Sequence, residues 1–147
     1  MVMKLQMKTI DPENVSLKDL IERGTEFHGH LGPFLVLGIR MGLLALKDLG
    51  SSGHKDVEAL VRTGTTPPIS CLVDGIQIST GCTMGKGNIA TEDLGRAEAT
   101  FYADGKSLTL KVKDKVIAEI KAGKYVNLED FAWEVSERRD EELFDRI

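Results

Sequence analysis

The stretch that decides the fold is PFLVLGIRMGLLALKDLG, residues 33–50. It is apolar on almost every side, which predicts the central buried helix of the domain. Pro33 suits the first turn of a helix because its missing N–H has no partner there, and Gly50 is a typical C-terminal stop. Gly38 and Gly42 lack side chains, so they would let another backbone approach this helix closely.

The segments on either side of this helix carry start and stop signals of their own. A first helix begins at Ser16, a capping residue, and its apolar face extends into FHGH at residues 27–30. Residues 57–63 predict a strand, and the proline pair at 67–68 bars a helix until the chain has passed it. A third helix fits residues 70–80.

The second half of the chain changes to a period of two. Residues 97–103 and 108–112 alternate between apolar and polar side chains around Asp104-Gly105, a dipeptide typical of hairpin turns. Residues 116–122 predict a short helix, and a last helix begins after Asn127, a good N-cap. Together the elements predict an α+β fold in which helices pack on an antiparallel sheet.

Length and charge restrict the class of protein. The 147 residues suit one compact domain over residues 1–147, and the net charge of −4 argues against a nucleic-acid binder with a broad basic surface. The longest apolar run, residues 35–46, is shorter than the roughly 20 residues of a membrane span, and residues 1–10 show no signal peptide. We therefore expect a cytoplasmic protein with reduced cysteines, and neither nucleic acid nor a membrane as partner.

Both cysteines lie in CLVDGIQISTGCTMGKGN, residues 71–88. The glycines do not form a Walker phosphate loop, because the spacing is one residue short and Gly87 stands where the magnesium-binding Ser or Thr belongs. A disulfide between Cys71 and Cys82 would need an oxidising compartment. A metal site fits the stretch better than either of these interpretations.

The residue types of a zinc site recur in two places. Cys71 and Asp74 are three residues apart and share one helix face, while Cys82 follows the helix end. His28 and His30 both reach one ion only if the first helix has already ended; otherwise one of them binds and the other orients it or carries a proton. For each cysteine taken alone, a small buried core residue is the alternative interpretation.

The blocks FHGHLGPFLVLGIRMG (27–42) and CLVDGIQISTGCTMGKGN (71–88) together resemble the family of formylmethanofuran dehydrogenase E subunits. Its members typically read HGHxCPG, an apolar helix, C-x-x-D-x-x-Q and GCTxGKGN. The resemblance covers the core domain only, because no cysteine follows Cys82 for the C-terminal zinc finger of longer relatives. It implies a homodimeric α+β core with one site for zinc or another divalent transition metal. The metal ligands that it implies are His28, His30, Cys71 and Cys82.

The resemblance also implies an accessory or small metalloenzyme role in one-carbon or molybdenum/tungsten enzyme metabolism, with subunits of a larger dehydrogenase complex as partners. In this role Asp74 would orient a ligand or polarise bound water, and Lys86 would favour a thiolate or bind an anionic substrate. The family usually has a cysteine at the position of Gly32. The glycine therefore removes one candidate thiolate from this chain. A water or substrate could then complete the metal's coordination.

Two alternatives need no metal. Cys82 could be the nucleophile of a thiol or redox enzyme, with His28 nearby as the base. The chain could instead be a non-catalytic interaction subunit that uses Gly38, Gly42 and the charged tail at 134–146 as an interface.

Overall fold

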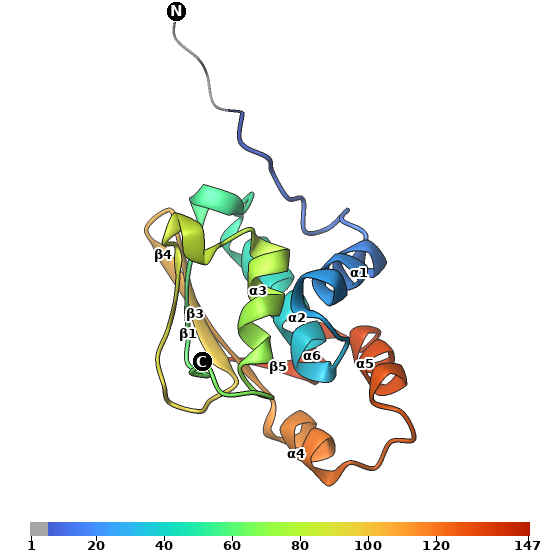
Figure 1. The fold of residues 1–147 in the computed structure, drawn as a ribbon. Helices are drawn as coiled ribbons and strands as arrows, with labels where there is room; N and C mark the ends of the chain where they lie inside the picture. Colours follow the sequence, from blue (N-terminus) through green and yellow to red (C-terminus); the bar gives the residue numbers. More distant parts are fainter. Residues whose placement is uncertain (1–5) are drawn as a thin grey trace, which may run out of the picture.

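In the computed structural model, which describes residues 6–147, six α-helices pack on a five-stranded sheet (Figure 1). The helices are α1 (Leu17–His28), α2 (Pro33–Leu49), α3 (Cys71–Thr80), α4 (Asp114–Ala122), α5 (Leu128–Ser136) and α6 (Asp140–Leu143). The strands are β1 (Glu58–Val61), β2 (Ile89–Thr91), β3 (Glu98–Ala103), β4 (Lys106–Val112) and β5 (Phe144–Arg146). Two 3-10 helices, η1 (His54–Asp56) and η2 (Met84–Lys86), lie in the connections. The predicted α+β class is confirmed.

The sheet has the strand order β2-β1-β3-β4-β5 and is mixed rather than purely antiparallel. Strands β3 and β4 form the predicted hairpin around Asp104-Gly105, and β1 and β5 pair antiparallel with their neighbours β3 and β4. Only β1 and β2 run parallel, because α3 carries the chain back along the sheet before β2 starts. The predicted antiparallel sheet is therefore correct except at this edge.

The central helix is α2, and it crosses α3 at van der Waals contact between the backbones. A Cβ atom built on Gly38 would lie 2.2 Å from the Leu72 carbonyl oxygen, and one on Gly75 would lie 2.2 Å from the Leu35 carbonyl oxygen. These two glycines face each other, so any side chain at either position would push the helices apart. The close backbone approach that Gly38 predicts is therefore between α2 and α3 of the same chain.

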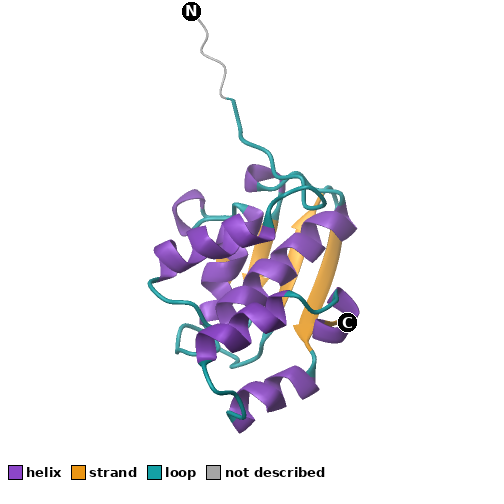
Figure 2. Ribbon diagram, turned by 90° about the vertical axis from the view of Figure 1, so that its right-hand side faces the viewer, coloured by secondary structure: helices purple, strands orange, loops and turns teal. Residues whose placement is uncertain are grey.

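The helices α1 and α5 pack against this pair. Figures 1 and 2 show α2 and α3 against one face of the sheet, with α1 and α5 on the outer side of α2. The helix α4 stands apart at one end (Figure 1). Within residues 6–147, none of the helices is long and apolar enough to cross a membrane.

Local signals predict most of the helix starts. The Ser16 hydroxyl accepts a hydrogen bond from the Asp19 N–H at 3.2 Å, and the Asn127 side chain accepts one from the Asp130 N–H at 3.1 Å. The short elements β2, α6 and β5 have no counterpart in the predictions. Strand β5 comes from the charged tail at 134–146, for which the sequence suggests an interface, and it covers the free edge of β4.

Candidate metal centre

The HGH segment turns directly at the end of α1. The helix ends at His28, and the Gly29 N–H donates to the Thr25 carbonyl at 2.7 Å. The chain then folds back so that the His28 and His30 rings lie 4.6 Å apart between centroids, tilted by 33°. Because the helix ends here, the condition for both histidines to face one centre is met.

The first residue of α3 completes a group of three candidate ligands. The ligand atoms of His28, His30 and Cys71 all lie within 4.8 Å of one another. The Cys71 side chain is buried, the His28 imidazole is 12% exposed, and His30 lies at the surface. Imidazole nitrogen from the early chain and sulfur from the middle therefore meet around a common centre.

Asp74 holds the His28 ring in place from the back. Its Oδ2 atom lies 2.5 Å from His28 Nδ1, one helical turn below Cys71 on the same face of α3. The opposite ring atom, His28 Nε2, is buried and has no hydrogen-bond partner among the described residues. A carboxylate on one imidazole nitrogen and nothing on the other is the arrangement of a metal-binding histidine in its carboxylate-oriented form.

A chain of hydrogen bonds connects Asp74 to the glycine-rich loop. Gln77 Nε2 lies 3.4 Å from Asp74 Oδ1, and Gln77 Oε1 accepts the Met84 N–H at 3.1 Å. The amide of Gln77 therefore joins η2 to the carboxylate that orients His28. From the sequence alone, Gln77 could be placed only on the flank of the helix. That position does not predict its hydrogen bonds to Asp74 and to the Met84 N–H.

Cys82 and Lys86 lie at the other end of α3. The Cys82 thiol is fully buried and donates to the Val57 carbonyl at 3.5 Å. Lys86 Nζ donates to the Gly81 carbonyl at 2.6 Å and to the Thr83 hydroxyl at 3.1 Å, so it caps the carbonyl end of the helix. Neither side chain belongs to the group of three ligands, and their predicted ligand and catalytic roles stay predictions.

Burial favours the thiol form of both cysteines over the thiolate. It raises the pKa of the Cys71 thiol, and the negative charge of Asp74 raises it further. Burial also raises the pKa of Cys82, an effect that Thr80 and Lys86 only partly offset. A metal ion binds the thiolate, so its binding at Cys71 must displace a proton.

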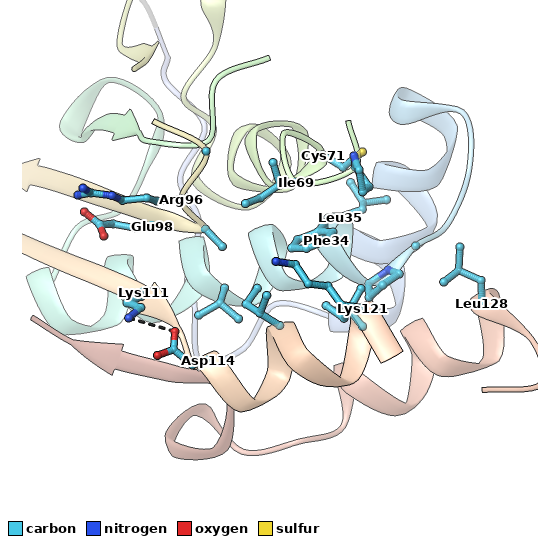
Figure 3. A pocket seen from close by; sticks show the side chains of 18 of the residues that line it. Phe34, Leu35, Ile69, Cys71, Arg96, Glu98, Lys111, Asp114, Lys121 and Leu128 are labelled. Carbon is cyan, nitrogen blue, oxygen red and sulfur yellow. Dashed lines mark ion pairs between the residues drawn. The ribbon is translucent and has the colours of Figure 1, made fainter. Parts of the chain in front are cut away.

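The three candidate ligands lie on the wall of a pocket of about 1000 Å³, part of which Figure 3 shows. The start of α2, the strands β3 and β4, the helix α4 and the segment around Tyr125 enclose the rest of it. Most of the lining side chains are apolar, and a few charged ones project into it. A site of this form is open to a small molecule on one side of the ligand group.

Comparisons with known proteins identify the family of the chain and support its fold. The profile described as "FmdE, Molybdenum formylmethanofuran dehydrogenase operon" matches residues 27–145, so the chain belongs to the FmdE family. A crystal structure of a tungsten formylmethanofuran dehydrogenase FmdE-like protein from Syntrophus aciditrophicus has a TM-score of 0.70 and 23% identity. The match covers 96% of this chain and 77% of that one, and at this identity it supports the fold alone.

One curated relative is known by a different description. A "Probable S-adenosyl-L-methionine-binding protein" of Archaeoglobus fulgidus is 39% identical over 91 residues. The match covers 58% of this chain and 24% of that protein, so the chain spans about a quarter of the relative's length.

Position 32 explains how the family's usual cysteine relates to the site. Gly32 precedes α2, and a Cβ atom built on it would lie 3.9 Å from His30 Nε2. A side chain here would therefore start beside the ligand group. In this chain the glycine leaves that side of the group open to the pocket, which Gly32 itself lines.

Proposed function

We propose that the protein binds one divalent transition metal ion, zinc first, through His28, His30 and Cys71. The observation that carries the proposal is the buried His28 Nε2, which has no partner among the described residues although Asp74 orients the ring. A buried polar atom without a hydrogen bond is unusual in a folded protein, and a metal ion would satisfy it.

The donor atoms suit zinc in kind and in spacing. Zinc binds imidazole nitrogen and thiolate sulfur at about 2.0–2.3 Å, which sets neighbouring ligand atoms of a tetrahedron roughly 3.5 Å apart. The ligand atoms here lie within 4.8 Å of one another, so side-chain rotations that move them by about 1 Å would close the group. Three protein ligands and an open side are typical of catalytic rather than structural zinc.

The residues around the proposed metal ion have separate roles in binding it. When bound, the metal supplies Lewis acidity to a group of a molecule in the pocket. Asp74 keeps the proton of His28 on Nδ1, so that Nε2 presents its lone pair. The apolar wall around Cys71 keeps bulk water from the thiolate.

The wider role follows from the family and the open pocket together. We propose an accessory or small metalloenzyme function in one-carbon or molybdenum/tungsten enzyme metabolism, in the cytoplasm, where cysteines stay reduced. A homodimer and subunits of a dehydrogenase complex are the proposed partners. The family description supports this, since it names a formylmethanofuran dehydrogenase operon.

Metal analysis of the purified protein tests the proposal. We expect about one zinc or similar ion per chain, and X-ray absorption showing one sulfur and two imidazole ligands. The variant Cys71→Ala should lose the ion, while the matched control Cys82→Ala should retain it. A protein that neither retains nor takes up a divalent metal would contradict the proposal.

A further inference from the structure

The charged residues of the pocket leave an excess of positive charge. Those that line it are Arg96, Glu98, Lys111, Asp114 and Lys121. Glu98 is paired with Arg62 outside the pocket at 3.2 Å, and Lys111 is paired with Asp114 at 3.2 Å. Within residues 6–147, neither Arg96 nor Lys121 makes an ion pair, so the unpaired charges of the lining are both cations.

Lys121 is the better placed of the two cations. It belongs to the last turn of α4, and Figure 3 shows its side chain extending into the pocket beneath Phe34. In that view it lies between the Cys71 end of the pocket and the end at Arg96. An ammonium group on a long, flexible stem can adjust to an acidic group there.

The other walls of the pocket are apolar, so they favour a ligand with a large apolar part. Phe34 and Leu35 from α2, Ile69 before α3, and Ile117 and Ile120 from α4 all line the pocket. A small hydrated anion such as phosphate would leave these surfaces unfilled, whereas a volume of about 1000 Å³ suits a molecule of drug size. Burying apolar area against such walls is favourable at roughly 25 cal/mol per Å².

We infer that the pocket takes an elongated, mostly apolar carboxylic acid, which reaches the metal ligands with one end and pairs its carboxylate with Lys121. At Lys121, one ammonium group balances one negative charge, which favours a carboxylate there over a doubly charged phosphate. The inference rests on the proposed metal function for the anchoring of the first end. The binding of the carboxylate end follows from the positive charge of Lys121 and from the apolar walls, and it does not depend on the metal.

Two metal-binding probes of equal shape test the inference on the zinc-loaded protein. The first probe, suberic acid monohydroxamate, has a metal-binding hydroxamate at one end and a carboxylate at the other. The second probe is the same molecule with an uncharged primary amide in place of the carboxylate. By titration calorimetry we expect the acid to bind roughly fivefold more tightly than the amide, the effect of one partly exposed ion pair. This preference should disappear in Lys121→Met.

Lys115→Met is the matched control, because Lys115 lies on the same helix and does not line the pocket. It should keep the full preference, and equal thermal unfolding midpoints would show that both variants are folded. Equal binding of acid and amide to the unaltered protein, or an unchanged preference in Lys121→Met, would overturn the inference and leave the metal site intact.

A metal-independent probe separates the two proposals. If the protein takes up no zinc and binds neither hydroxamate, the proposed function fails, and the anchoring of the first end fails with it. Anilinonaphthalene sulfonate, an apolar anion that fluoresces when bound, then reports on the second end. Binding weakened severalfold by Lys121→Met but not by Lys115→Met would support an anion-binding pocket, and equal binding to all three proteins would overturn it.

Discussion

One sequence motif, residues 71–88, spans both ends of α3, and the two ends differ in their surroundings. At the N-terminal end, Cys71 and Asp74 face the histidines, and Cys71 lines a pocket open to small molecules. At the C-terminal end, Cys82 is 0% exposed and Lys86 caps the helix. The comparison teaches that residues which belong to one motif need not share one site. The first end brings the three candidate ligands together, and the second closes the helix on which Cys71 lies.

The largest expected effect contrasts the two cysteines. Cys71→Ala should weaken zinc binding by more than about 100-fold, because loss of an outer partner alone typically weakens it 10–100-fold. Cys82→Ala should leave zinc affinity unchanged and lower the free energy of unfolding by about 1 kcal/mol, since it removes a buried atom. Competition with a chromophoric chelator and urea denaturation measure the two quantities. Equal loss of zinc in both variants would break the contrast.

The next effect concerns the carboxylate behind His28. Asp74→Asn keeps the size of the side chain but removes its charge, so zinc affinity should fall about 10–100-fold. Lys86→Met, at the other end of the helix, should change it less than twofold. A chelator titration of both variants decides the matter, and a stronger effect of Lys86→Met would assign Lys86 to the site.

The thiols of the metal-free protein should show a pH dependence displaced to alkaline values. Their pKa values are raised above the ordinary 9.0, so the thiolate forms only at higher pH and is scarce at neutral pH. We expect iodoacetamide to react about tenfold more slowly than with glutathione near neutral pH, and faster as the pH rises past 9. Fast labelling of Cys82 near neutral pH would instead favour the thiol-enzyme alternative.

The smallest effect should come from the link between the two ends. Gln77→Leu breaks the contacts to Asp74 and to the Met84 N–H. Zinc affinity should fall only about two- to threefold, because Asp74 still holds His28 directly. Faster hydrogen exchange of the Met84 amide would show that the link is broken. No change in affinity together with faster exchange would limit Gln77 to holding the loop.

Much of this arrangement could be predicted because its signals are local. The caps Ser16 and Asn127 form bonds within one turn of helix, and Asp104-Gly105 needs only its own backbone to close the hairpin. The ligand types in HGH and in the first turn of α3 are also visible in the chain. By contrast, Lys121 has no sequence signal beyond a lysine on a short helix, since only the packing shows which face of α4 borders the pocket.

By itself, the sequence determined the α+β class, the start and end of the principal helices, the family, and three of the residues that meet at the centre. Only the tertiary structure decided that Cys82 lies elsewhere. The chain leaves α3 through Gly81 at a φ of +77°, where a Cβ atom would lie 2.4 Å from His54 Nδ1. That turn directs the following thiol toward Val57, away from the histidines. Spacing along a chain limits which side chains can meet, but the direction of each turn decides which of them do.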